Sequence, residues 1–203
     1  MQSILLQALG VILALTVTFF DIRGKVVARP LSMVYMITSL FVYYPAGLYS
    51  RCVFQCITFT LDTYGWYHWL YGGKNKTPLQ VSKTAPGFIV ALVVLGPLAA
   101  WGWGKLLAHY ANTTLTYWDA LNTIICIAAQ WLLVRKKLET WLLWLLADAL
   151  YTVVLYNKSL YLFSGLHICY IILTINGYIA WRQSYLQQTM AASTPSKTFN
   201  KEQ

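Results

Sequence analysis

The chain has 203 residues, of which 58% are hydrophobic and only 10% are charged, and its mean hydropathy is +0.53. A soluble domain usually carries about 25% charged residues. The composition therefore excludes an ordinary soluble domain and indicates an integral membrane protein with little mass outside the bilayer. The net charge of +9 does not indicate nucleic-acid binding, because the cations lie in short loops between apolar runs.

Seven apolar runs are each long enough to cross a bilayer as a helix. Their predicted bounds are Ser3–Phe20, Pro30–Ala46, Leu48–Tyr71, Pro86–His109, Leu115–Val134, Leu138–Tyr156 and Leu160–Arg182. The first run lacks a basic segment and a small-residue cleavage site, which favours a retained helix over a cleaved signal. The four cysteines lie inside these runs without zinc-type spacing or disulfide pairing, so we expect no metal and no cofactor.

The distribution of Lys and Arg predicts the orientation of these helices. The sequence has fifteen Lys and Arg residues. Only three of them, Arg51, Lys105 and Lys158, lie on the side of the membrane that holds the loops after the second, fourth and sixth runs. The other twelve lie in the loops after the first, third and fifth runs and in the C-terminal segment. Because cations concentrate on the cytoplasmic side, we expect the N-terminus outside and the C-terminus in the cytoplasm.

The chain also contains an internal repeat. A shift of 112 residues, without a gap, places Arg23, Lys25, Tyr44, Leu48, Tyr49, Gly65 and Trp69 on Arg135, Lys137, Tyr156, Leu160, Tyr161, Gly177 and Trp181. The predicted organisation is a first three-helix repeat at residues 1–71, a polar linker and connecting fourth helix at 72–114, a second repeat at 115–182, and a disordered cytoplasmic tail at 183–203. Two copies in the same orientation form a 3+1+3 parallel repeat, which is common among transporters with a substrate site between the halves.

Polar side chains at membrane depth give the candidate site. In the sixth run, Trp141, Trp144, Asp148 and Tyr151 follow steps of three, four and three and share one helix face. Acids within apolar helices are costly and suggest function, and aromatic rings beside an acid suit a flat, cationic or polar ligand. Similar polar faces occur in the third, fifth and seventh runs. They add Gln55, Asp62 and Trp66, then Gln130, and then Tyr170 and Asn176 as candidate substrate-binding residues.

Several of these positions have a structural alternative. Trp66 and Trp69 fit interfacial belt positions as well as a site, and Trp181 fits the belt better than a ligand contact. His167 and Asn122 fit hydrogen bonds between helices. Asp62 and Asp148 are harder to explain structurally, because each lies at least two turns from the nearest loop cation.

Specific segments of the chain resemble the PnuC family of vitamin-precursor transporters. They are Y-G-W-Y-H-W at 64–69, W-D-A-L at 118–121, A-A-Q-W-L-L-V-R-K-K-L-E-T-W-L-L-W at 128–144, S-L-Y-L at 159–162 and N-G-Y-I-A-W at 176–181. The resemblance implies an all-α, seven-helix fold of the SWEET type in the inner (cytoplasmic) membrane. It also implies facilitated diffusion of nicotinamide riboside, trapped by a cytoplasmic kinase, with thiamine or riboflavin as alternatives. We expect no buried Arg or Lys, which argues against a phosphorylated substrate.

Two further function classes have less support in the sequence. An intramembrane lipid-modifying enzyme would need a catalytic motif, and neither H-E-x-x-H nor G-x-S-x-G occurs. An assembly subunit without transport activity would not need acids at membrane depth. The sequence thus predicts a transporter rather than an enzyme, with a small vitamin and the lipid bilayer as partners and no nucleic acid, and it leaves open whether the chain forms a homo-oligomer.

Overall fold

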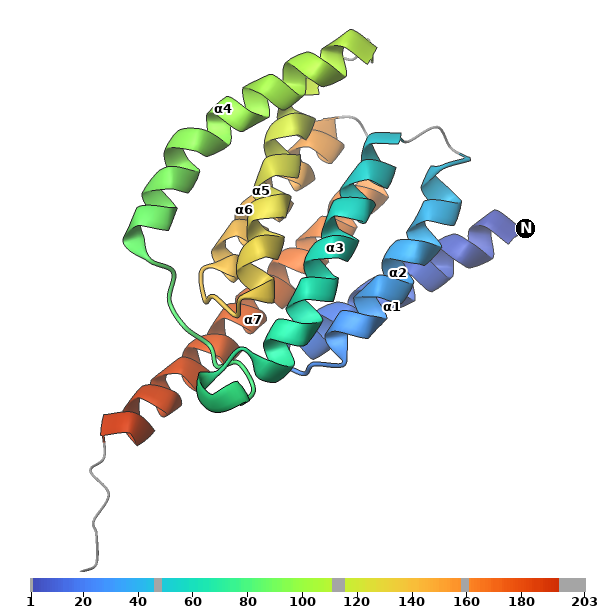
Figure 1. Ribbon diagram of the computed structural model, residues 1–203. Helices are drawn as coiled ribbons and strands as arrows, with labels where there is room; N and C mark the ends of the chain where they lie inside the picture. Colours follow the sequence, from blue (N-terminus) through green and yellow to red (C-terminus); the bar gives the residue numbers. More distant parts are fainter. Residues whose placement is uncertain (1, 46–48, 111–115, 158–160, 194–203) are drawn as a thin grey trace, which may run out of the picture.

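The computed structural model describes residues 2–45, 49–110, 116–157 and 161–193, and these residues form an all-helical structure (Figure 1). Its seven α-helices are α1 (Gln2–Ile22), α2 (Ala28–Tyr43), α3 (Tyr49–Tyr71), α4 (Pro86–Tyr110), α5 (Thr116–Val134), α6 (Thr140–Asn157) and α7 (Tyr161–Ser193). Each predicted apolar run becomes one helix, which confirms the all-α prediction.

The C-terminal helix is longer than predicted. Helix α7 continues to Ser193, so the first part of the segment predicted as a disordered tail is helical, whereas residues 194–203 lie outside the described residues. The extension is polar, but Tyr185 packs against the buried aromatic cluster and Lys83 lies 5.5 Å from its ring centre. This packing explains the longer helix, because tertiary contacts stabilise a helix more than intrinsic propensity does.

Six of the helices form a closed ring. Helix α2 lies between α1 and α3, helix α6 lies between α5 and α7, and the contacts of α3 with α5 and of α1 with α7 close the ring. Helix α4 packs against the outside of α5 (Figure 1). The ring gives each of the three-helix segments one middle helix, and it directs one face of every ring helix toward a shared interior.

Two helical stretches are long and apolar enough to cross a membrane by length and composition, Pro86–Leu106 and Ser164–Ala191. Shorter apolar stretches occur at Ala8–Ile22, Ala28–Val42, Ala120–Val134 and Thr140–Val154. Helix α3 belongs to neither group, because it carries the polar face that includes Gln55 and Asp62.

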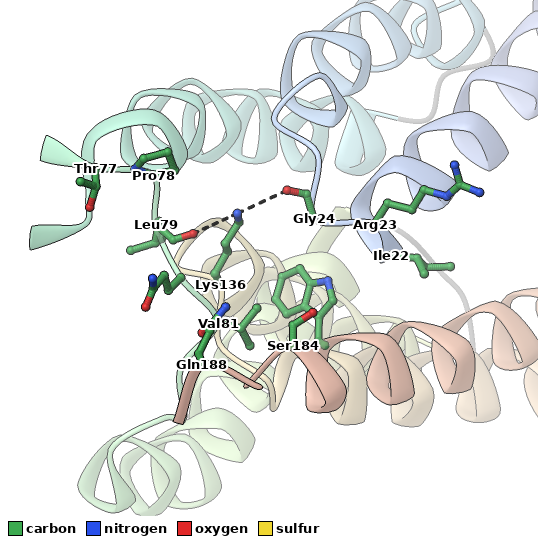
Figure 2. Close-up of a pocket in the computed structure, with 12 residues that line it drawn as sticks. Ile22, Arg23, Gly24, Thr77, Pro78, Leu79, Val81, Lys136, Ser184 and Gln188 are labelled. Atoms are coloured by element: carbon green, nitrogen blue, oxygen red, sulfur yellow. Dashed lines mark hydrogen bonds between the residues drawn. The ribbon is translucent and has the colours of Figure 1, made fainter. Parts of the chain in front are cut away.

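At one end of the ring, three loops are fastened to one another around Lys136 (Figure 2). The ammonium of Lys136 donates to the carbonyl of Gly24 at 3.3 Å and to that of Leu79 at 3.0 Å. These carbonyls belong to the α1–α2 loop and to the linker between α3 and α4. Lys136 itself lies in the α5–α6 loop, so a single side chain connects all three.

The linker between α3 and α4 is a strap rather than a free polar spacer. Ser82 pairs with the α5–α6 loop through backbone hydrogen bonds, from its N–H to Lys136 O at 3.0 Å and from Leu138 N–H to its carbonyl at 2.9 Å. Thr84 donates to Glu139 through its N–H at 2.8 Å and through its hydroxyl at 2.6 Å. These bonds hold Val81 in the aromatic cluster beneath the strap.

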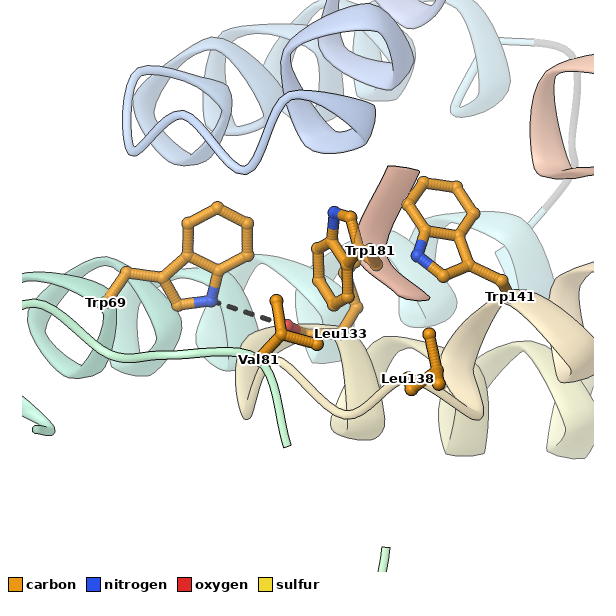
Figure 3. Packing of buried hydrophobic residues seen from close by; sticks show 6 residues of the cluster. All are labelled: Trp69, Val81, Leu133, Leu138, Trp141 and Trp181. Atoms are coloured by element: carbon orange, nitrogen blue, oxygen red, sulfur yellow. Dashed lines mark hydrogen bonds between the residues drawn. The ribbon is translucent and has the colours of Figure 1, made fainter. Parts of the chain in front are cut away.

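The buried cluster at this end consists of Trp69, Trp141 and Trp181 with Val81, Leu133 and Leu138 (Figure 3). The belt alternative for Trp69 and the belt expectation for Trp181 are wrong, because these side chains are 0% and 1% exposed. Burial is tolerated because both indole N–H groups have acceptors. Trp69 donates to Val134 O at 3.1 Å, and Trp181 donates to Asp21 O at 2.9 Å.

These indole hydrogen bonds follow the internal repeat. The indole nitrogen of Trp69 also lies 3.3 Å from Leu133 O. In the repeat, Trp69 corresponds to Trp181 and Leu133 corresponds to Asp21, so this contact is equivalent to the Trp181–Asp21 hydrogen bond with the two segments exchanged. The third helix of each segment thus donates to the end of the first helix of the other segment. The loops match too, because Gly24 and Lys136 occupy equivalent positions and both have left-handed backbone, with φ of 62° and 48°.

Close packing at Gly177 gives a first prediction. A Cβ atom at this position would lie 2.4–2.5 Å from three ring atoms of Trp141, which is buried and cannot move aside. Gly177→Ala is therefore expected to lower the free energy of unfolding by about 1–3 kcal/mol, measured as a lower melting temperature in detergent. Gly165→Ala on the same helix meets nothing within 4 Å and is the control. Equal melting temperatures for both variants would contradict the prediction.

Candidate functional site

The first polar cluster inside the ring is centred on Asp62 of α3, which is fully buried. One carboxylate oxygen accepts from the Arg29 guanidinium at 2.5 Å and from the Gln130 amide at 2.6 Å, and the other accepts from the Ser32 hydroxyl. The second guanidinium nitrogen of Arg29 pairs with Asp21. The cluster therefore joins α1, α2 and α3 through Arg29, and Asp62 connects it to α5.

The expectation that Asp62 lacks a cation is wrong, as is the expectation that no Arg or Lys is buried. Arg29 is 0% exposed and Lys136 is 8% exposed. Sequence reasoning assigned Arg29 to a loop, but it lies in the first turn of α2, and Asp62 is 33 residues away along the chain. The sequence contained one indication of this pairing, because a second acid, Asp21, directly follows the first apolar run.

Position 29 and its repeat equivalent, position 141, carry different side chains, an arginine and a tryptophan. The guanidinium carbon of Arg29 lies 4.7 Å from the ring centre of Trp69. The ring of Trp141 meets Trp181 edge to face, with centres 5.4 Å apart. A cation–π contact in one segment thus corresponds to an aromatic pair in the other. Trp141, a predicted site residue, is a 3% exposed member of the aromatic cluster.

The second polar cluster lies between α6 and α7. Asp148 Oδ1 is 2.9 Å from Nδ1 of His167, and these side chains are 12% and 23% exposed. The His167 ring is 5.2 Å from the ring of Tyr151 and 5.9 Å from that of Tyr170. The structure thus brings three predicted site residues, an acid and two aromatic rings, together around His167.

His167 is the residue that the sequence-based site lacks. It was assigned to hydrogen bonding between helices, although it shares a face of α7 with Tyr170 and Thr174. The hydrogen bond to Asp148 does connect two helices, but the pair is only partly buried. The common helix face was the available signal, whereas the partner on α6 could not be identified from the sequence.

The remaining predicted site residues divide into interior and exterior positions. Gln55 is buried on the face of α3 that carries Asp62, and Trp144 is half-buried on α6. Trp66, one turn after Asp62 on α3, is 41% exposed. Asn176 is exposed as well, and its amide donates to Ile172 O of its own helix at 3.0 Å.

Beside the strap, Lys136 borders a cavity of about 480 Å³ at the loop end of the ring (Figure 2). Other lining residues are Arg23, Gln80, Trp181, Ser184 and Gln188. The Lys136 ammonium lies 4.3 Å from the centre of the Trp69 ring. Burial, together with the charge of Arg29, lowers the pKa of Lys136 to about 8. Within the described residues, no group of three or more His, Cys, Asp or Glu side chains is arranged to hold a metal ion.

A ring of mostly apolar helices that carries two polar clusters is typical of a helical membrane transport protein, in which acids within apolar helices mark substrate or ion pathways. The chain belongs to the nicotinamide mononucleotide transporter family, whose model matches residues 4–183. By its description, this is a family of transporters.

Similar proteins agree with the family. The nicotinamide riboside transporter PnuC of Escherichia coli K12 is 22% identical over 168 residues, which covers 70% of each chain, and PnuC of Shigella flexneri gives the same values. The crystal structure of the vitamin B3 transporter PnuC has a TM-score of 0.70 and 17% identity, and covers 90% of this chain and 82% of that one. At this identity, the structural likeness shows the shared fold.

Proposed function

We propose that this chain takes up nicotinamide riboside by facilitated diffusion, with a cytoplasmic kinase trapping the product by phosphorylation. The observation that carries the proposal is the partly exposed Asp148, held by His167 and flanked by Tyr151 and Tyr170. Nicotinamide riboside contains a cationic pyridinium ring, and a carboxylate beside aromatic faces attracts such a ring by charge and by stacking. The names of the bacterial relatives support the same substrate.

The charges of the ring interior favour the riboside over its phosphorylated form. Arg29 is bound by two carboxylates, and Lys136 is occupied by two backbone carbonyls. Arg29 with Asp21 and Asp62 carries a formal charge of −1, and Asp148 adds a further negative charge when ionised. A phosphate dianion would enter a negative environment, whereas a cationic ring would be attracted.

For the mechanism, we propose alternating access between a first three-helix half, residues 1–71, and a second, residues 115–182, with α4 as the connection. The exchanged indole bonds of Trp69 and Trp181 support two equivalent halves, because each bond crosses from one half to the other. With the N-terminus outside, the aromatic cluster lies at the cytoplasmic end. Opening that end separates α3 from α5 and α1 from α7, which breaks both indole bonds.

The test is counterflow in proteoliposomes that contain the purified chain. Labelled nicotinamide riboside is expected to accumulate against unlabelled riboside inside, without an ion gradient or ATP, and nicotinamide mononucleotide is expected not to exchange. Thiamine carries a cationic thiazolium and is the alternative substrate, with riboflavin as an uncharged competitor. Exchange of thiamine or riboflavin, but not of the riboside, would overturn the substrate assignment, and no exchange of any vitamin would overturn transport.

A second prediction concerns the charge of Asp148. Asp148→Asn keeps the shape of the side chain and removes the charge, so affinity for nicotinamide riboside should fall by about 1 kcal/mol, or about fivefold in Kd. The reduced riboside has a neutral dihydropyridine ring and should lose little affinity in the same calorimetric titration. Equal losses for both ligands would show that Asp148 acts through hydrogen bonding or folding rather than through charge.

A further inference from the structure

The side chains of Trp69, Trp181 and Lys136 connect the first three-helix half to the second at the loop end of the ring. Two of these connections are the indole hydrogen bonds. The other is the 3.3 Å bond from the Lys136 ammonium to the carbonyl of Gly24, which joins the α5–α6 loop to the α1–α2 loop (Figure 2). All of these contacts oppose the opening of this end that the proposed mechanism requires.

The contact between Lys136 and Gly24 lies where the two halves meet. The shift of 112 residues places Gly24 on Lys136. The ring follows the same relation, because α3 contacts α5 and α7 contacts α1. Two equivalent positions lie on opposite sides of the two-fold axis that relates them, so their direct contact places the Lys136 ammonium close to that axis. In a parallel repeat this axis runs along the membrane normal, between the halves.

We propose that Lys136 is the gate residue of the cytoplasmic end, and that the path between the two halves opens when its bond to Gly24 breaks. This inference rests on the proposed function and names a residue that controls one of its two conformations. Lys136 acts through the position of the loops and does not bind the vitamin.

The bonds of the strap indicate which contact of Lys136 breaks. Backbone bonds of Ser82 hold the strap to the α5–α6 loop at 3.0 and 2.9 Å, and Lys137 donates to the Ser82 hydroxyl at 2.9 Å. The Lys136 ammonium also lies closer to Leu79 O of the strap, at 3.0 Å, than to Gly24 O. The strap therefore stays with the second half during opening, and the α1–α2 loop separates from both.

The surroundings of Lys136 make its bonds effective in the closed state and replaceable in the open one. The side chain is 8% exposed, and a hydrogen bond from a charged donor is strengthened where water is excluded. Once the end opens, water can solvate both the ammonium and the carbonyl of Gly24. The closed state gains the difference between these environments, so loss of the charged donor shifts the equilibrium toward the open state.

The experiment measures how often the loop end opens, with a cysteine placed in the aromatic cluster. Leu133→Cys is suitable, because Leu133 is 4% exposed and its carbonyl lies against the Trp69 indole. A polar thiol reagent reaches this position when α3 separates from α5. The full-length protein is purified in detergent, and mass spectrometry measures the labelling rate at position 133 separately from the native cysteines.

In this background, Lys136→Met should be labelled about tenfold faster, as the loss of hydrogen bonds from a charged donor predicts. Lys136→Arg keeps a charged donor and should restore nearly the parent rate. Lys137→Met is the matched control, because Lys137 lies in the same loop and donates to Ser82 and Lys83 of the strap. Its labelling rate should equal that of the parent. An unchanged rate in Lys136→Met, or an equal rise in Lys137→Met, would overturn the inference.

A milder variant keeps the test decisive if Lys136→Met does not fold. Lys136→Gln replaces the ammonium by a shorter, uncharged donor and should also be labelled faster than the parent, and a parent-like rate would overturn the inference. Labelling needs no substrate, so it is separate from the proposed function. Counterflow that fails with every vitamin would refute transport alone, whereas counterflow with a labelling rate independent of Lys136 would refute the gate alone.

Discussion

Arg29→Met is expected to lower the free energy of unfolding by about 3–5 kcal/mol, because removing one partner of a buried ion pair leaves its charges uncompensated. Arg29 is the shared partner of Asp21 and Asp62, which are 5% and 0% exposed. The substitution therefore leaves two carboxylates in the interior without their cation. The measurement is the melting temperature of the purified protein in detergent.

Two further variants separate charge from packing. Adding Asp62→Asn to Arg29→Met should recover part of the loss, because one of the uncompensated charges is then removed. Lys105→Met is the matched control, since Lys105 is an exposed cation that lies 4.1 Å from the ring centre of Trp101. A melting temperature unchanged by Arg29→Met would show that Arg29 is not part of a buried network.

Trp181→Ala should also cost about 3–5 kcal/mol, the usual cost of removing a large buried aromatic side chain. Trp181 is 1% exposed, contacts both Trp69 and Trp141, and donates its indole N–H to α1. The loss combines a large cavity with an unsatisfied carbonyl at Asp21. Trp101→Ala on α4 is the control, because Trp101 is 56% exposed.

Replacement by Phe distinguishes the hydrogen bond from the packing. Trp181→Phe keeps most of the ring contacts and removes the indole donor, which should cost about 1 kcal/mol or more. Trp69→Phe removes the equivalent indole donor, which bonds to the carbonyls of Leu133 and Val134, and should cost a similar amount. A large difference in melting temperature between the two Phe variants would show that the indole bonds of Trp69 and Trp181 do not stabilise the contact between the two three-helix segments equally.

Apolar runs were sufficient to predict the helices, because helix length and hydrophobicity are local properties of the chain. They failed at the end of α7, where Tyr185 gains its packing partners from distant segments. Burial of tryptophan was also beyond local reasoning. An indole at a helix end suits the membrane interface and the core equally well, and the carbonyls that accept from Trp69 and Trp181 come from other helices.

The candidate site shows the same limit for charged groups. The face that carries Asp148 and Tyr151 was predicted from helical spacing, and the structure places His167 against it. The sequence indicates that Asp62 is unusual, but it does not identify Arg29 as its partner. An arginine near the start of a helix has the same local pattern as a cation in the preceding loop. Sequence spacing orders residues within one helix, whereas the pairing between helices depends on how the ring closes.

The position of Lys136 has a consequence for chemical reactivity. An amine with a pKa of about 8 is unprotonated in roughly a tenth of molecules at pH 7, far more than an ordinary lysine. The unprotonated amine is the nucleophilic form, so a small acylating reagent that enters the adjoining cavity should modify Lys136 faster than its burial would suggest. The rate of this acylation would then report how tightly the three loops hold together during transport.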